Sequence, residues 1–431
     1  MKFRLISRFG DGLGLAWRLS QTGHDVDFYI TEPASERLYA GLLKRVDRWN
    51  KDLTAETVVL FDMSGHGKIA DSIRQTGHKV YGGGGLNDQL ELDRHFARQV
   101  AKNAGINVPE TETYADYAEA ITEIRRRDGG WVYRPVNHSP APYTYVASST
   151  IEMQIMLEHF RRSAPHAQQE FTLQPMVPGV EVSIECWYVR GEPILSTLNS
   201  TLEATRFLTG GLGPRTGCQG SVAWFWKNPT NKLYRFTHEK LRPFLQRYRY
   251  DGPLNVRVIV MESDKRPVFL DFTARFGFNA IYALCEDLGV DLAELLSGAA
   301  GGESVALKPS YAWCGALRVT TPPFPYRLGK TFAGKPLARV DRASPHFWPL
   351  DVFESEGRLL TAGGDGVVCE LTARAPGLRE LGKALYGPAG DLILPDKQYR
   401  TDLIEHAQQD IERLTAWKYL KKTKMREHVN A

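Results

Sequence analysis

A carboxylate and a guanidinium stand close together where an apolar run ends, in residues 268–277, which read VFLDFTARFG. Asp271 could hold Mg²⁺ through oxygen, and Arg275 could grip a phosphate or carboxylate by two parallel hydrogen bonds. Thr273 lies between them in the sequence. A structural salt bridge between the acid and the arginine would explain the same residues. The stretch therefore predicts either a metal and anion site at the end of a strand or an internal ion pair.

Three glycine-rich stretches are further candidates for ligand contact. Residues 9–14 (FGDGLG) follow a strand-like run and open a helical one, where backbone N–H groups favour an anion, although a tight turn is the alternative. Residues 63–68 (MSGHGK) have the same setting beside a lysine and could equally be a surface turn. Residues 210–220 contain five glycines, which permit close approach to a ligand or form a flexible connection. His66 and His138 are either catalytic or loop histidines with local hydrogen bonds.

Strand-like runs alternate with helical patterns over the first 90 residues, as is typical of βαβ units on a parallel sheet. Two capping patterns, Asp88 with Glu91 and Ser149 with Glu152, each predict the start of a helix. Residues 254–262 and 266–272 are expected to pair as a hairpin, and residues 402–419 to form an amphipathic helix. These patterns together predict an α/β protein.

Composition narrows the classes further. The 431 residues are 42% hydrophobic and 24% charged, which predicts an ordinary globular protein of about two to four domains. The formal charge of +4 gives no indication of nucleic-acid binding, and the basic residues 417–426 are either a frayed terminus or a polyanion contact. Five widely spaced cysteines, no signal-peptide pattern and no run long enough to span a bilayer predict a reduced, cytoplasmic protein.

The order of these pieces resembles the ATP-grasp superfamily, and within it the glycinamide ribonucleotide synthetases (phosphoribosylamine-glycine ligases), over nearly the whole chain. DFTARFG at residues 271–277 is similar to that family's Glu-Phe-Asn-x-Arg-Phe-Gly, and GPRTGCQG at residues 213–220 is similar to its Gly-Pro-x-Thr-Gly-Gly-Met-Gly. The segments that carry the resemblance, in chain order, are residues 6–17, 71–82, 94–106, 174–183, 213–220, 271–277 and 363–369.

The resemblance implies an α+β ATP-grasp architecture in three parts. Residues 1–90 would form an N-terminal Rossmann-like domain. Residues 91–305 would form a two-lobed ATP-grasp domain, with a small lid lobe at about 111–178. Residues 306–431 would form a small C-terminal domain with a mixed sheet and a basic tail.

The resemblance also implies an activity, ATP-dependent formation of a C–N bond between a small carboxylate and a small amine through an acyl phosphate, with ATP and Mg²⁺ as cofactors. Asp271 and Arg275 would be catalytic, and Asp271 and Thr273 would hold the metal. The residues expected to bind nucleotide are Arg94, Arg134, Gln174, Met176, Val177 and Glu181. Those expected to bind substrate are Gly10, Gly12, Lys68, Thr216, Gly217 and Gly220.

The chain departs from the family at three loops. Residues 136–145, which match the phosphate-covering loop, contain no glycine and no lysine. Residues 278–280 read FNA in place of Asp-Pro-Glu, and residues 63–68 replace a loop of the phosphoribosylamine site. The sequence therefore predicts a ligase with a different amine or, as the alternative, a catalytically degenerate homologue that binds a nucleotide or a partner. A monomer or homodimer is expected, with no nucleic acid or membrane partner.

Overall fold

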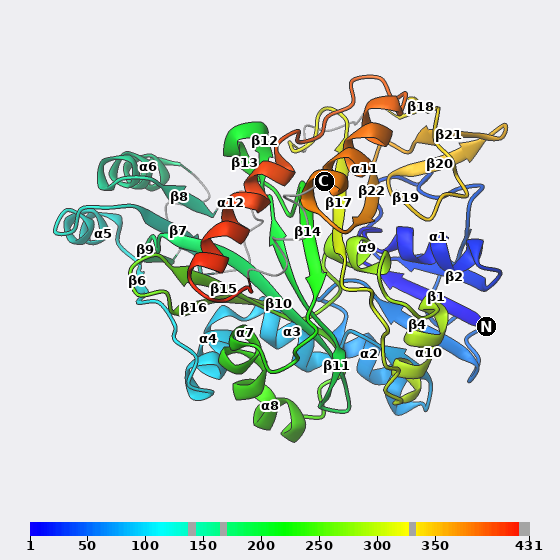
Figure 1. Cartoon of the computed structure of the whole chain (residues 1–431), viewed down its shortest axis with the longest axis horizontal. Coiled ribbons are helices and arrows are strands. Elements are labelled where there is room, and N and C mark those ends of the chain that lie inside the picture. Colours follow the sequence, from blue (N-terminus) through cyan, green and yellow to red (C-terminus); the bar gives the residue numbers. More distant parts are fainter. Residues whose placement is uncertain (137–143, 164–169, 327–332, 422–431) are drawn as a thin grey trace.

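The computed structural model describes residues 1–136, 144–163, 170–326 and 333–421. A small lobe that contains α5 and α6 projects from a larger body, and the N-terminal sheet lies at the opposite end of that body (Figure 1). Among the described residues, no helix is long and apolar enough to cross a membrane. Half of the predicted basic tail, residues 422–426, lies outside the described residues, as do His138 and most of the loop at residues 136–145.

The N-terminal region is a five-stranded parallel sheet in the order β3-β2-β1-β4-β5. Strand β1 is buried over nearly its whole length, as expected for a parallel strand covered on both faces. The predicted βαβ pattern is confirmed. The strands are β1 (Lys2–Ser7), β2 (Asp25–Ile30), β3 (Lys44–Arg45), β4 (Thr57–Phe61) and β5 (Lys79–Tyr81), and the helices between them are α1 (Leu13–Gln21) and α2 (Gly67–Gln75).

The capping pattern predicted at Asp88 is wrong, because two helices occupy this region. Helix α3 (Gly85–Leu92) already contains Asp88, whose carboxylate instead accepts from the backbone N–H groups of a neighbouring loop. The side chain of Asp93 accepts from the backbone N–H of Phe96 and caps helix α4 (Arg94–Asn103). The short acidic side chain at residue 93 thus sets the break that brings Arg94 to a helix N-terminus.

The small lobe is a four-stranded sheet in the order β6-β9-β7-β8 with two helices on it. It has its own apolar cluster, which includes Tyr133, Leu157 and Phe171. Ser149 caps α6 as predicted, since its hydroxyl accepts from the backbone N–H of Glu152 at 3.2 Å. The elements are β6 (Glu112–Tyr114), α5 (Tyr117–Ile124), β7 (Trp131–Pro135), β8 (Tyr145–Ala147), α6 (Thr150–Arg162) and β9 (Phe171–Pro175).

An eight-stranded sheet forms the centre of the body, in the order β16-β15-β10-β11-β14-β17-β22-β19. The predicted hairpin is confirmed as β15 and β16, which pair antiparallel. Strand β14 pairs with β17, so the sheet runs without a break into the C-terminal third. The strands are β10 (Gly179–Val189), β11 (Glu192–Glu203), β14 (Gly220–Phe225), β15 (Gly252–Met261), β16 (Pro267–Thr273), β17 (Trp313–Thr320), β19 (Phe347–Pro349) and β22 (Val367–Ala375).

Smaller elements complete the body. Within the glycine-rich stretch at residues 210–220, residues 210–215 contribute the turn and the second strand of a short hairpin, and residues 216–219 connect it to the central sheet. Helix α12 covers the central sheet near the predicted position. These elements are β12 (Arg206–Leu208), η3 (Thr209–Gly211), β13 (Leu212–Arg215), α7 (Lys232–Phe236), α8 (His238–Arg247), α9 (Ala280–Cys285), α10 (Leu292–Gly301), β18 (Pro336–Leu337), β20 (Val352–Ser355), β21 (Arg358–Thr361), α11 (Leu378–Asp391) and α12 (Leu403–Ala416).

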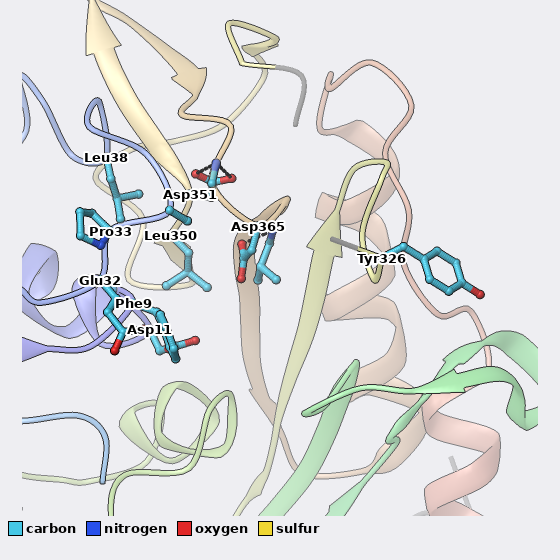
Figure 2. Close-up of a pocket in the computed structure, with 13 residues that line it drawn as sticks. Phe9, Asp11, Glu32, Pro33, Leu38, Tyr326, Leu350, Asp351 and Asp365 are labelled. Atoms are coloured by element: carbon cyan, nitrogen blue, oxygen red, sulfur yellow. Dashed lines mark hydrogen bonds between the residues drawn. The ribbon is translucent and has the colours of Figure 1, made fainter. Parts of the chain in front are cut away.

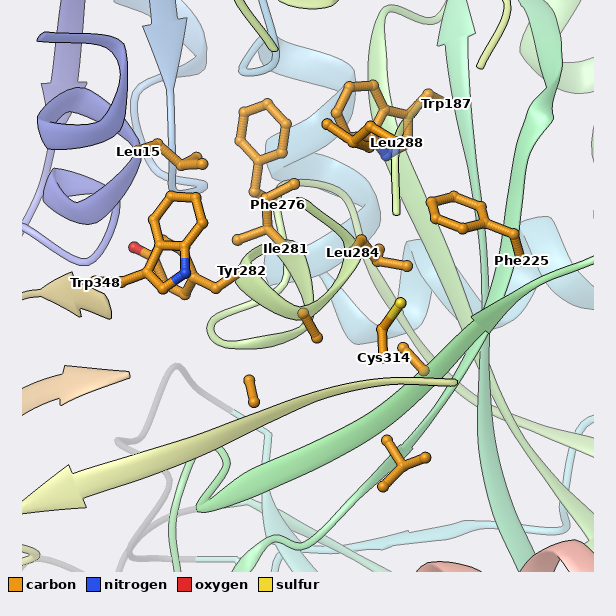
Figure 3. Packing of buried hydrophobic residues seen from close by; sticks show 14 of the residues in the cluster. Leu15, Trp187, Phe225, Phe276, Ile281, Tyr282, Leu284, Leu288, Cys314 and Trp348 are labelled. Atoms are coloured by element: carbon orange, nitrogen blue, oxygen red, sulfur yellow. The ribbon is translucent and has the colours of Figure 1, made fainter. Parts of the chain in front are cut away.

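One apolar core connects the N-terminal sheet to the rest of the body. Tyr282 of α9 packs against Trp348 of β19 with ring centroids 4.9 Å apart, beside Leu15 of α1 (Figure 3). A Cβ on Gly14 would lie 2.9 Å from the Tyr282 ring, so this glycine permits the close approach of α1. The division at residues 90 and 305 stays a prediction, because the apolar core is continuous across both points and the central sheet crosses the second.

Candidate active site

A cavity of about 490 Å³ lies where the small lobe, α4 and the β15–β16 hairpin meet. It is called the larger cavity below, because a second cavity of about 380 Å³ lies elsewhere in the molecule. Its described lining is rich in positive charge, with six arginines and three carboxylates and no lysine. The arginines are Arg94, Arg98, Arg134, Arg215, Arg257 and Arg275, and the carboxylates are Glu91, Glu203 and Asp271. A concave site with clustered guanidinium groups is suited to an anion with several charged oxygens.

A β-bulge explains how strand β16 presents its acid to this cavity. Arg257 pairs in register with Asp271, whereas the next residue of β15 pairs with Phe269, which leaves Leu270 as the extra residue. Such a bulge re-aims the side chains that follow it. Asp271, Phe272 and Thr273 all line the cavity, and the Phe272 side chain is also part of the buried core.

Asp271 forms an ion pair with Arg257 and not with the arginine four residues later. Arg257 donates from Nε to one carboxylate oxygen at 2.9 Å and from Nη2 to the other at 2.6 Å. Burial opposes the charged form of Asp271, but the charges of Arg257, Arg134 and Arg94 outweigh it and hold the pKa of this carboxyl below its usual value. Asp271 is therefore an ionised acid beside the cavity.

Arg275 has a different partner, Glu91 of α3. Arg275 Nε donates to Glu91 Oε1 at 2.9 Å, and its Nη1 donates to the carbonyl of Phe276. The guanidinium also lies over the ring of Phe278 at 4.0 Å from its centroid. Arg275 is thus held by three different groups, in a fixed orientation at the cavity wall.

Arg94, Arg134 and Arg215 differ from these two, because none of them has a carboxylate within 4.0 Å among the described residues. Arg94 donates only to the carbonyl of Pro135, at 3.3 Å, within that part of the chain. Burial lowers the pKa of Arg134 to about 10 and shifts the pKa of Arg94 and of Arg215 in the same direction. Partly desolvated guanidinium groups without counter-ions are a strong electrostatic attraction for phosphate.

The four other residues predicted to bind nucleotide lie in three different settings. Gln174 at the end of β9 is buried and lines the cavity. Met176 and Val177 follow it outside the described lining, where the backbone N–H of Met176 donates to the carbonyl of Gly130. Glu181 reaches the site through Arg257, with its Oε1 3.2 Å from Arg257 Nη1.

The residues predicted to bind substrate are scattered. Thr216 and Gly217 line the larger cavity. Gly220 lies within the central sheet, where an added Cβ would be 2.8 Å from Leu403, so its small size serves packing. Lys68 is exposed and lines neither of the two cavities described.

Both predicted N-terminal glycine loops already have internal carboxylates on their backbone N–H groups. Asp88 accepts from Gly65 and Gly67 at 2.6 and 2.8 Å, and Asp62 accepts from Gly12 at 2.6 Å. These acids occupy positions that a ligand anion would need. Buried His66 is one of the loop histidines considered, and its Nε2 lies 3.1 Å from the hydroxyl of Thr31.

A second cavity of about 380 Å³ lies beside the first glycine loop, and Gly10 lines it. Asp11 and Glu32 come from the N-terminal region and Asp351 and Asp365 from the C-terminal third (Figure 2). No lysine or arginine is among its described lining residues. Burial raises the pKa of Asp351 to about 7, although backbone N–H groups of a glycine loop donate to this carboxyl. This cavity has the opposite charge to the first.

Sequence reasoning missed the arginine and the two glutamates that hold the site together, namely Arg257, Glu91 and Glu203. A signal existed for Arg257, since it is the one charged residue in the apolar run LNVRVIVM. Glu203 is at the end of a long strand, and burial raises its pKa to about 7 against the charge of Arg257. Nothing in the sequence marked Glu91 as a site residue, because its spacing from Asp88 fits a helix cap.

The predicted metal ligands do not fit Mg²⁺ in this arrangement. Mg²⁺ needs carboxylate oxygens at about 2.0–2.1 Å, and both oxygens of Asp271 accept from Arg257 instead. In the described part of the chain, no three histidine, cysteine, aspartate or glutamate side chains form a group that could hold a metal ion. Thr273 alone supplies only a neutral hydroxyl.

Comparison with known proteins agrees with the resemblance found in the sequence. No protein-family model matches the chain. Phosphoribosylamine-glycine ligase of Streptomyces coelicolor is 24% identical over 351 residues, which cover 79% of this chain and 81% of that protein. Phosphoribosylamine-glycine ligase from Thermotoga maritima has a TM-score of 0.71 at 17% identity, covering 93% of this chain and 100% of that one.

A wider likeness extends to other enzymes of the same fold. The complex of biotin carboxylase with β,γ-ATP from Campylobacter jejuni has a TM-score of 0.64 at 11% identity and covers 96% of each chain. The chain therefore has the ATP-grasp fold and resembles the phosphoribosylamine-glycine ligases, with active-site motifs that have diverged from theirs.

Proposed function

We propose that the chain is an ATP-dependent ligase that joins a small carboxylate to a small amine through an acyl phosphate. The observation that carries this proposal is a set of three arginines that line one cavity of about 490 Å³ and have no carboxylate partner among the described residues, namely Arg94, Arg134 and Arg215. The relatives that match the chain are ligases by name, which favours catalysis over nucleotide or partner binding without turnover.

ATP supplies the phosphoryl group that activates the carboxylate. Arg94 and Arg134 would neutralise the phosphate oxygens, and Gln174, which lines the same cavity, would contact the nucleotide. Catalysis of phosphoryl transfer depends mainly on positioning and on charge neutralisation, which a cluster of guanidinium groups provides. Mg²⁺ accompanies ATP in solution, but among the described residues the acids of this site do not fit it, because both oxygens of Asp271 accept from Arg257.

The reaction then has two steps. A carboxylate oxygen of the acid attacks the γ-phosphorus, and the bond from that phosphorus to ADP breaks. The amine nitrogen next attacks the acyl carbon, phosphate leaves, and the nitrogen loses a proton. Arg275, held by Glu91 and Phe278, would fix the carboxylate or the transferred phosphoryl group by a two-point contact.

The proposed substrate region is the mouth of the same cavity near Thr216 and Gly217. Gly10, Gly12, Lys68 and Gly220 lie apart from it, as described above. Phosphoribosylamine is therefore one candidate amine among several, and the acid and the amine are both to be identified by assay. A monomer or a homodimer is expected for the enzyme.

Release of ADP from Mg-ATP tests this function, with glycine and a panel of amines that includes phosphoribosylamine generated in place. Substrate-dependent ADP release should fall by at least about 100-fold in Arg275→Ala, in line with the loss of a transition-state contact. It should also fall in Asp271→Asn, because Arg257 loses its ionised partner at the edge of the cavity. Arg126→Ala is the matched control, because Arg126 is an exposed arginine of the small lobe. No ADP release with any pair of substrates, despite nucleotide binding, would sink the ligase assignment.

A further inference from the structure

Three carboxylates from three different strands surround one arginine at the edge of the larger cavity. Glu181 lies on β10, Glu203 ends β11, and Asp271 lies near the end of β16. Arg257 of β15 lies between them, with Nη1 3.2 Å from Glu181 and 3.9 Å from Glu203 and with Nη2 2.6 Å from Asp271. All four side chains are partly shielded from solvent, with exposed fractions from 18% to 35%.

Three acids this close need a cation, because like charges in a partly buried site repel strongly. The planar guanidinium meets Asp271 with two parallel hydrogen bonds and still directs a third donor toward the two glutamates. It stays charged at every physiological pH, and the pairing raises the pKa of Arg257 well above its usual value despite burial. The acids thus have a permanent counter-ion of their own.

We infer that the guanidinium of Arg257 takes the place of a protein-bound divalent cation among Glu181, Glu203 and Asp271. Nucleotide binding then requires no metal held by these acids. Only the second test below depends on the proposed function, and only on the part of it that concerns nucleotide binding. It assigns to Arg257 a positioning role, since this arginine orders the acids under the phosphate site.

The surroundings of the cluster favour this assignment. Arg94 and Arg134 lie close enough to influence the ionisation of Asp271, so the local field already opposes a further cation. Both arginines also lack carboxylate partners of their own among the described residues, so they can meet the phosphate charge that a metal would otherwise neutralise. Moving Arg257 out of the cluster would cost free energy, because three acids would lose their counter-ion at once.

The first test titrates the protein with Mn²⁺ alone and follows free Mn²⁺ by electron paramagnetic resonance. Wild type should bind no Mn²⁺ at this cluster. Arg257→Gln should gain a single site, and the double variant with Asp271→Asn should lose it again. A wild-type site that Asp271→Asn removes would overturn the proposal, and so would an Arg257→Gln protein that gains none.

The second test measures ADP binding by calorimetry with EDTA and with Mg²⁺. For wild type we expect dissociation constants within about threefold of each other, and for Arg257→Gln a loss of about tenfold in EDTA that Mg²⁺ partly restores. Arg257→Lys keeps the charge without the fork and should lie between the two. Arg257→Lys also replaces Arg257→Gln in this calorimetric test if the glutamine variant does not fold.

Tenfold or greater dependence on Mg²⁺ in wild type would contradict the proposal. The outcome is separate from that of the ligase assay, because neither test requires turnover. If the protein binds ADP without metal but releases no ADP from ATP in the ligase assay, this inference stands and the proposed function is wrong.

Discussion

The two cavities differ in the sign of their charge, although each lies where separate parts of the fold meet. Six arginines against three carboxylates line the larger cavity, whereas four carboxylates and no described lysine or arginine line the smaller one. The first glycine loop, expected to bind an anion, borders the acidic cavity through Gly10. A glycine loop at a helix start is therefore not sufficient for an anion site, since internal acids decide the local charge.

The two regions also satisfy their buried charges in different ways. In the larger cavity each acid has an arginine, as Asp271 has Arg257 and Glu91 has Arg275. Beside the acidic cavity, Asp62 accepts from Ser7 and Gly12, and burial raises its pKa to about 7 with a smaller contribution from Asp11. Neighbouring arginines thus favour the ionised form of Asp271 in one region, whereas burial favours the protonated form of Asp62 and Asp351 in the other.

The largest expected effect concerns Asp62. The folded protein retains a proton on Asp62 that the unfolded chain releases, so the free energy of unfolding falls as pH rises from about 4 to about 7. Asp62→Asn should reduce that fall by about 4 kcal/mol, because a difference of about three pKa units corresponds to that energy. Denaturant unfolding at pH 5 and pH 8 should record about 2.5 kcal/mol of it, because about two of these three pKa units lie between pH 5 and pH 7.

The asparagine keeps an oxygen for Ser7 and Gly12 and places an amide where Oδ1 has no partner among the described residues. Asp128→Asn on the exposed surface is the control. If the free energy of unfolding depends equally on pH in wild type and in Asp62→Asn, then Asp62 holds no additional proton in the folded protein.

The second prediction sharpens the assignment of the cationic cavity. Arg134→Gln should weaken ADP binding by about 10- to 100-fold, because a charge-assisted hydrogen bond contributes about 1.5–3 kcal/mol. Asp365→Asn in the acidic cavity should leave the ADP affinity within about twofold of wild type. Isothermal titration calorimetry of both variants, with Arg126→Gln as the exposed control, decides whether only one cavity binds nucleotide. Equal losses in both variants would remove the distinction.

The smallest effect concerns the glycine loop. A Cβ on Gly12 would lie 2.6 Å from the Cβ of Asp62, so Gly12→Ala should lower the free energy of unfolding by about 2 kcal/mol through overpacking. ADP affinity should not change. Gly387→Ala in α11 is a matched control, because nothing lies within 4 Å of an added Cβ there and alanine favours the helix.

Thermal unfolding with and without ADP measures both quantities. A folded Gly12→Ala protein that no longer binds ADP would return the nucleotide to the first glycine loop.

Local periodicity determined much of the fold. The βαβ alternation of the first 90 residues, the β15–β16 hairpin and the Ser149 cap of α6 all appear where their patterns indicated. Each depends on residues close together in the chain, whose spacing directly reflects strand or helix geometry. The ordered motifs also pointed to the ATP-grasp fold, and the arginines of α4 and β7 do line one cavity.

The partners of the charged residues were decided only by tertiary structure. Asp271 and Arg275 stand four residues apart, yet the first pairs with Arg257 and the second with Glu91. Glu181 and Glu203 join the same cluster from strands that the sequence does not place side by side. Ion pairing depends on distance and burial in space, which a linear pattern does not encode. The sequence therefore identified the charged groups of the site, whereas the packing of the strands and helices determined which of them pair.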